Sequence, residues 1–261
     1  MYQRGLGIGI CWTLDRREDV PFEQDSHAAT DERIAKAAQH HDFLRWSWEP
    51  KELINTATLV PKWAALDYLR WKTARINSFG LGVMADPYHL PTLDDTELSA
   101  VTSKSLDLMS ALATAVQTTL SGLDYRIELK NEPGIKVVPA AASPQQRFYT
   151  RVTQIIAASP DPSKIVIPCY QAGEDSIGMT TFQTGKTYAF HLNRGTIARW
   201  ESAKAQLAGK SVICTEVSGD AEVLRWVRKN YPASLHHAAW GMENADPNFT
   251  PTFEKQIAIG K

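Results

Sequence analysis

Two glutamates stand where apolar, strand-like runs of the sequence end. Glu132 follows the alternating run YRIELK (residues 125–130) in the tripeptide NEP, and Glu216 closes the run KSVICTE (residues 210–216). Two carboxyl groups about 5 Å apart can cleave a glycosidic bond, because the protonated one donates a proton while the ionised one attacks carbon. Glu132 alone could equally belong to a surface turn, so its role depends on the elements that position both residues.

Eight strand-like runs alternate with longer amphipathic runs along the chain. Several of the short runs are continuously apolar, as strands buried on both faces are. The strand candidates are residues 5–12, 42–48, 79–86, 125–130, 164–170, 186–191, 210–216 and 235–240. The helix candidates are residues 30–40, 62–76, 94–120, 144–158, 196–208 and 219–230, with short ones at 173–182 and 252–259. Ser143 is the expected N-cap of its helix, with Pro144 at the first helical position.

Strands that alternate with helices predict right-handed βαβ units and a parallel sheet. Eight such units in 261 residues match the size of a (β/α)₈ TIM barrel, so we expect an α/β fold with one catalytic barrel domain over residues 1–261. The alternative is an open, doubly wound sheet. The glycines of GLGIGICW (residues 5–12) lie inside the strand pattern and no helix follows at once, unlike a GxGxxG phosphate-binding fingerprint, which favours the barrel.

Composition excludes several function classes. Hydrophobic residues make up 43% and charged residues 22%, as in a soluble globular protein. The formal net charge of −1 lacks the excess of positive charge that nucleic-acid binding proteins use to contact phosphates. No apolar run approaches the roughly 20 residues that span a bilayer. The N-terminus lacks the order of a signal peptide, so cytoplasmic, phage-delivered and trimmed secreted origins all stay open. Cys11, Cys169 and Cys214 lie in strand-like runs without metal-ligand spacing and are expected to be buried thiols.

Polar and aromatic residues stand at the predicted carboxyl ends of the strands, where barrels carry their chemistry. Aromatic faces suit the flat C–H faces of sugar rings, and the candidates for such stacking are Trp12, Trp48, Tyr88, Tyr170 and Trp240. The polar candidates for substrate binding are Arg45, His89, Asn131 and His191. Arg45 as a structural ion pair, and the two histidines as core residues, remain alternative interpretations.

These strand ends resemble those of the clan A glycoside hydrolases, most nearly the family 5 cellulase-like enzymes. That family carries Asn-Glu-Pro at the end of strand four and a nucleophilic Glu at the end of strand seven, as LKNEP and ICTEVSG do here. It also carries an Arg on strand two, a His after strand three, a His at strand six and a Trp at strand eight. The matching residues are Arg45, His89, His191 and Trp240, whereas Asn193 stands where family 5 enzymes usually have a Tyr.

The resemblance implies a monomeric, retaining endo-glycosidase that binds and cleaves a β-linked polysaccharide or oligosaccharide without metal or organic cofactor. Glu216 would be the nucleophile and Glu132 the acid and then the base. Arg45 would keep Glu216 ionised, and Asn131 would bind the sugar 2-hydroxyl. The alternative function is a non-catalytic carbohydrate-binding barrel, as in a structural or virion component. A metal-dependent barrel hydrolase would need a His-x-His cluster, which the strand ends lack.

Overall fold

The computed structural model describes the backbone of residues 8–12, 31, 34, 35, 38, 43–88, 103–130, 142–167, 187–192, 211–217 and 235–241. Side chains are described for residues 31, 34, 35, 38, 43–46, 48–88, 103–130, 148–167 and 187–189. The rest of the chain lies outside the described residues.

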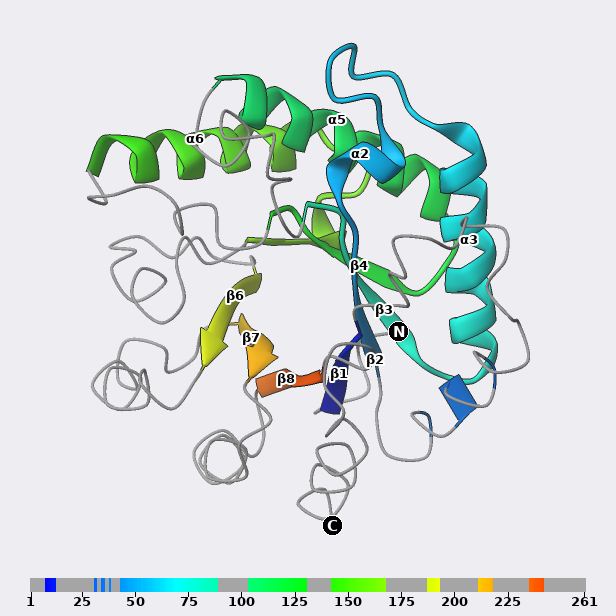
Figure 1. Ribbon diagram of the computed structural model, residues 1–261. Coiled ribbons are helices and arrows are strands. Elements are labelled where there is room, and N and C mark those ends of the chain that lie inside the picture. The colour runs from blue at the N-terminus through cyan, green and yellow to red at the C-terminus, as the bar shows by residue number, and fades with distance from the viewer. Residues whose placement is uncertain are drawn as a thin grey trace.

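Eight parallel strands close into a barrel in chain order (Figure 1). They are β1 (Ile8–Trp12), β2 (Phe43–Ser47), β3 (Gly82–Asp86), β4 (Tyr125–Glu128), β5 (Ile165–Ile167), β6 (Thr187–Leu192), β7 (Ser211–Val217) and β8 (Leu235–Gly241). The last strand pairs with the first, placing Gly9 opposite Ala238 and Cys11 opposite Trp240. This closure confirms the predicted barrel over the open sheet, and each predicted strand overlaps an observed one.

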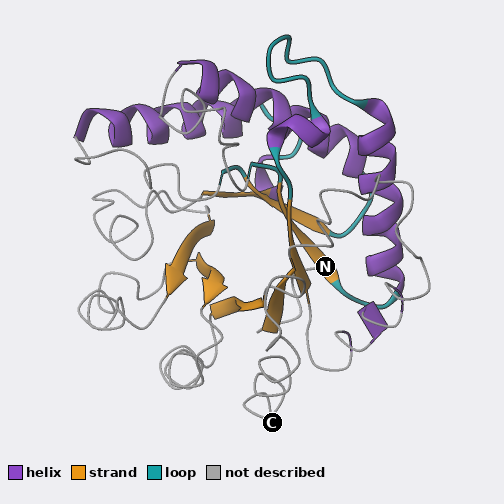
Figure 2. Ribbon diagram, in the orientation of Figure 1, coloured by secondary structure: helices purple, strands orange, loops and turns teal. Residues whose placement is uncertain are grey.

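The helices lie outside the ring of strands (Figure 2). They are α2 (Pro50–Leu53), α3 (Trp63–Ser78), α5 (Ser103–Leu120) and α6 (Ala142–Ala158), with a 3₁₀ turn, η2, at Pro162–Lys164. The helices predicted near 62–76 and 144–158 are confirmed. The single turns α2 and η2 were not predicted, although each begins with a proline, which suits a first helical position. Residues 94–102 and the predicted helices at 173–182, 196–208, 219–230 and 252–259 lie outside the described residues.

The start of α6 differs from the prediction by two residues. The helix begins at Ala142, so Ser143 lies within its first turn instead of capping it. Pro144 then occupies the third helical position, where its missing N–H breaks no intrahelical hydrogen bond. The turn η2 has a clear cap, because the Asp161 carboxylate accepts a hydrogen bond from the backbone N–H of Ser163 at 3.1 Å.

The main hydrophobic core fills the space between the strands and the helices. It joins Leu44 of β2, Val83 of β3 and Ile127 of β4 to Leu69 of α3 and Leu112 of α5, all essentially without exposed surface. Successive residues of a strand point to opposite faces, so these positions define the outward face of each strand. The buried face of α3 recurs at three- and four-residue spacing, as helix periodicity requires.

The inward faces of the same strands carry charged as well as apolar groups. By strand alternation, Phe43 and Arg45 of β2, Met84 of β3 and Glu128 of β4 point into the barrel, and all four are fully buried. A barrel of eight strands is just wide enough for side chains to fill its interior. A buried charge needs a partner in such an interior, because leaving water is otherwise costly.

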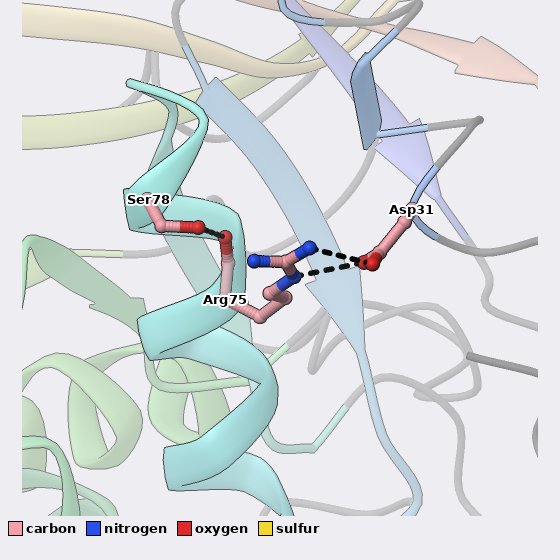
Figure 3. A network of polar contacts seen from close by, with 3 residues as sticks. All are labelled: Asp31, Arg75 and Ser78. Carbon is pink, nitrogen blue, oxygen red and sulfur yellow. Dashed lines mark hydrogen bonds and ion pairs between the residues drawn. The ribbon is translucent and has the colours of Figure 1, made fainter. Parts of the chain in front are cut away.

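A surface ion pair ties the helical residue Asp31 to α3 (Figure 3). The Arg75 guanidinium donates to the two Asp31 carboxylate oxygens at 3.0 and 2.7 Å, and these contacts raise the pKa of Arg75 above its ordinary value. The Ser78 hydroxyl donates to the carbonyl of Arg75 in the last turn of the helix. None of the described helices combines the length and apolar character needed to cross a bilayer.

Candidate active site

The backbone places β4 and β7 as parallel strands of one closed barrel, so their carboxyl ends open on the same rim. Glu216 is the second-last residue of β7. Strand β4 ends at Glu128, and the chain reaches Asn131 and Glu132 three and four residues later. Asn131 and Glu132 lie outside the described residues, as does the side chain of Glu216. Their separation therefore stays a prediction.

A β-bulge interrupts β7 next to Glu216. Its pairing with β6 passes from Phe190–Cys214 to His191–Glu216, so β7 has one more residue than β6 over this step. The pairing with β8 likewise gains one residue on β7 between Cys214 and Val217. Bulges are common at barrel rims and beside active sites, where they redirect a strand. The register also brings the backbone of two predicted site residues, His191 and Glu216, side by side.

Arg45 forms a buried charged cluster with Asp86 and Glu128, which we call the rim triad. Arg45 Nη2 lies 2.9 Å from Asp86 Oδ2 and 2.9 Å from Glu128 Oε2, and Arg45 Nε donates to the same Glu128 oxygen at 3.0 Å. All three side chains have an exposed fraction of 0%. The triad joins the middle of β2 to the last residues of β3 and β4.

The physical chemistry of the rim triad explains its composition. An arginine suits this position because its guanidinium stays charged and presents several donors in a fixed planar fork. Charge-assisted hydrogen bonds to carboxylates are roughly twice as strong as neutral ones. Removing one partner from such a buried cluster is strongly destabilising, because the remaining charge keeps its desolvation cost without its partner.

The contacts of Arg45 correct part of its predicted role. The sequence led us to expect Arg45 to bind substrate and to hold Glu216 ionised. The guanidinium is buried, and its described contacts are with Asp86 and Glu128. The Glu216 side chain lies outside the described residues, so the second role stays a prediction. A buried side chain held by two carboxylates is placed to position the rim and not to contact a sugar. Glu128 was missed as a site residue. Its signal is present in YRIELK, where a carboxylate on a buried strand requires a cationic partner.

Trp48 does not present the exposed ring that the sequence led us to expect. Its exposed fraction is 3%, and its ring lies against Trp46, with centroids 4.6 Å apart. Both rings belong to the core between strands and helices. Leu44 and Trp46 of β2 share the parity that faces the helices, and Trp48, just beyond the strand, packs against Trp46 on that side. The prediction that Trp48 stacks on a sugar is wrong for this structure.

Tyr88 is also buried, with an exposed fraction of 0%. It follows β3 in a turn and joins the core between strands and helices. The ammonium of Lys130, itself buried, lies 3.2 Å from the centroid of the Tyr88 ring. This cation occupies a position that sugar stacking would need, so the predicted sugar-binding role of Tyr88 is wrong for this structure. Lys130 was not predicted as a partner.

The remaining predicted site residues are described only in their backbone or lie outside the described residues. Trp12 ends β1 opposite Gly241, and Trp240 precedes Gly241 in β8, so the two tryptophans follow neighbouring strands to the rim. His191 lies in β6. His89 and Tyr170 lie outside the described residues. Among the described residues, no group of three or more His, Cys, Asp or Glu is arranged to hold a metal ion.

Solved structures similar to this chain are enzymes of glycoside hydrolase family 5. The structure of PbGH5A, a family 5 enzyme from Prevotella bryantii B14, with a xyloglucan tetradecasaccharide is 12% identical, covers 98% of this chain and 96% of its own, and has a TM-score of 0.75. A broad-specificity family 5 endoglucanase from Clostridium longisporum is 10% identical, covers 99% and 96%, and has a TM-score of 0.73. A Bacteroides ovatus family 5 xyloglucanase with a heptasaccharide is 13% identical, covers 98% and 73%, and has a TM-score of 0.68.

The likeness extends over nearly the whole chain, and it establishes the fold. This chain has the (β/α)₈ barrel architecture of those enzymes. The family that the strand-end motifs resemble is also the family of these solved structures. No protein-family model matches the sequence, and no curated protein matches it.

Proposed function

We propose that the protein is a retaining endo-glycoside hydrolase that cleaves internal linkages of a β-linked polysaccharide. The observation that carries the proposal is the closed parallel barrel, in which the carboxyl ends of β4 and β7 open on the same rim. Glu216 lies near the carboxyl end of β7, and Asn131 and Glu132 follow β4 in the sequence. The solved structures of the same fold support it, because they are glycoside hydrolases.

The proposed reaction has two displacements. The Glu216 carboxylate attacks the anomeric carbon while Glu132 gives its proton to the departing glycosidic oxygen, so a covalent glycosyl-enzyme forms. Glu132, now a carboxylate, removes a proton from water, and the water oxygen breaks the bond to Glu216 with net retention of configuration. The two glutamates need different pKa values for these roles, which their surroundings must set.

The remaining predicted rim residues would bind the sugar. Asn131 is proposed to contact the 2-hydroxyl, where hydrogen bonds strengthen in the transition state. The other proposed contacts are His89, His191, Trp12, Tyr170 and Trp240. No cofactor is needed for this chemistry.

The choice of substrates to test follows from the similar structures. Two of them hold xyloglucan-derived oligosaccharides, and another is an endo-β-1,4-glucanase from Bacillus licheniformis. A further one, from Bifidobacterium longum, holds Manβ1-4GlcNAc. We therefore propose a β-1,4-linked glycan as the substrate class. A panel of xyloglucan, cellulose-type glucans, mannans and their oligosaccharides, with sizing of the products, tests both the activity and its endo character.

The role of Glu216 is tested by its Glu216→Ala variant. Turnover should be lost, and azide should restore cleavage of an activated aryl glycoside, giving a product of inverted configuration. Asp67→Ala, which removes an exposed carboxylate on α3, is the matched control and should keep the parent activity. A non-catalytic carbohydrate-binding barrel makes the opposite prediction, because parent and variants would bind glycan equally and none would cleave it. Undiminished hydrolysis by Glu216→Ala would refute the mechanism.

A further inference from the structure

The rim triad is an unusual way to fill the inside of a barrel. Arg45 spans three adjacent strands, because it lies in β2 while Asp86 and Glu128 are the last residues of β3 and β4. A single nitrogen, Nη2, lies 2.9 Å from a carboxylate oxygen of each acidic partner. Apolar residues of similar volume would fill this space without the desolvation cost of three charges. The triad therefore calls for an explanation other than stability.

The location of the rim triad suggests that it holds the backbone at the carboxyl ends of three strands. The backbone carbonyl of Asp86 accepts a hydrogen bond from the N–H of Trp48 at 2.8 Å, so β3 also holds β2 where that strand leaves the sheet. Glu128 is anchored through Arg45 at the point where β4 ends. The chain is thus held at the carboxyl edge of three neighbouring strands.

A second contact holds the same exit from β4 two residues later. Lys130 is buried with its ammonium against the Tyr88 ring, and Leu129 between the two anchors is fully buried in the core. The segment from Glu128 to Lys130 is therefore fixed on both sides of the sheet. Glu132 follows Lys130 by two residues, whereas Glu216 is carried by β7, three strands farther round the barrel.

We propose that Glu128 is a positioning residue for Glu132, acting through Arg45 and Asp86 on the backbone that leads to the acid. This inference rests on the proposed function and refines it. The rim triad joins β2, β3 and β4, and β4 is the strand that leads to the proton donor, whereas the nucleophile is carried by β7. Glu128 itself does not touch the substrate.

The distinction has a chemical consequence. A general acid must lie within hydrogen-bond reach of the leaving oxygen, and a displacement of about 1 Å can cost roughly 100-fold in rate. That cost appears only when the leaving group needs a proton. A dinitrophenyl glycoside departs without one, so its first displacement depends on Glu216 and not on the placement of Glu132.

The test compares kcat/KM, which reports the first displacement, for two substrates with the same sugar. One is an oligosaccharide with a natural linkage and the other is its dinitrophenyl glycoside. Glu128→Gln keeps the side-chain size and one carbonyl acceptor but removes the charge. We expect a loss of about 10- to 100-fold on the natural linkage and less than about threefold on the aryl glycoside. The ratio of the two values does not change with the fraction of folded protein, so a purely structural role would leave it unchanged.

Two further variants complete the test. Asp86→Asn should shift the same ratio in the same direction, and it replaces Glu128→Gln if that variant does not fold. Arg151→Met removes an exposed ion pair with Asp107 and should leave the ratio as in the parent. Equal losses on both substrates in an active protein would overturn the positioning role while the proposed function stands. A parent protein that cleaves neither substrate would overturn the proposed function itself.

Discussion

The ammonium of Lys130 lies 3.2 Å from the centroid of the Tyr88 ring, and both residues are buried. The contact joins the segment after β4 to the turn after β3. A cation over an aromatic face contributes about 2 kcal/mol or more when it is removed from water. Tyr88 therefore has a structural role that its position at a strand end did not reveal.

Replacing the Tyr88 ring should weaken the fold without changing sugar recognition. Tyr88→Leu is expected to lower the free energy of unfolding by about 2 kcal/mol or more, because it removes the aromatic face and leaves a cavity. Tyr88→Phe keeps the ring and should cost about 1 kcal/mol or less. Urea unfolding measures both. A Tyr88→Leu protein with parental stability and a raised KM for glycan would instead place the ring in the substrate site.

The charges of the rim triad should be strongly coupled in stability. Arg45→Met leaves two buried carboxylates and is expected to cost about 3–5 kcal/mol, whereas the further change Glu128→Gln should recover part of that loss. A double-mutant cycle should give a coupling of about 0.5–3 kcal/mol between the two residues.

The matched control for this cycle is the exposed pair of Arg151 and Asp107. Its two charged groups lie 2.8 Å apart, slightly closer than the 2.9 Å of the triad, but the side chains are 33% and 56% exposed. The coupling there should be below about 1 kcal/mol, because water screens the pair and both side chains lose freedom. Similar couplings at the two sites would show that burial adds nothing to the rim triad.

Tyr125 should make the fold sensitive to alkaline pH. Its burial, and then the nearby carboxylate of Asp161, raise its pKa to about 12. The unfolded chain has a tyrosine pKa near 10. Between these two values the folded state keeps a proton that the unfolded state has lost, so stability falls as the pH rises from about 10 to about 12. Below pH 10 the stabilisation is fully present.

The variant Tyr125→Phe isolates this effect from the other tyrosines. It has no phenol proton to lose, so the difference in unfolding free energy between parent and variant should shrink as the pH rises through this window. Urea unfolding at a series of alkaline pH values measures the difference. A constant difference across the window would mean that Tyr125 ionises equally in both states.

A crystal structure should place the carboxyl groups of Glu132 and Glu216 within roughly 4.5–6 Å of each other, around the separation that retaining hydrolysis needs. A separation near 8 Å would instead indicate an inverting enzyme, because a water molecule would fit between the two groups. A separation beyond about 12 Å would remove the pair from any joint mechanism. The measurement is independent of the identity of the glycan.

The architecture could be predicted because its signals are periodic and repeated. Eight apolar runs in alternation with amphipathic ones fix a parallel sheet, and each predicted strand overlaps an observed one. Strand alternation also predicts that Arg45 and Glu128 face inward, although it does not predict that they pair. Helix starts were less predictable, as at Ala142, because a helix end depends on local capping and not on a repeated pattern.

The roles of aromatic residues at strand ends were not predictable from position. Trp48 and Tyr88 stand just beyond their strands, where a ring can turn to the rim or to the helices. The deciding contacts come from Trp46 and Lys130, and the contact with Lys130 comes from a distant part of the chain. Partner choice at long sequence separation is a tertiary property that no local pattern contains. The same holds for Arg45, whose carboxylate partner Glu128 is 83 positions away.

The pairing of β8 with β1 has a consequence for solubility. An open sheet of eight strands would leave two edges with unpaired backbone N–H and C=O groups, which recruit strands of other chains. Closure removes both edges at once, because Gly9 meets Ala238 and Trp12 meets Gly241. The first and last strands therefore each cover the edge of the other. Without β8, β1 and β7 are edge strands with unpaired backbone groups. A chain truncated before residue 235 should therefore aggregate instead of forming a smaller soluble barrel.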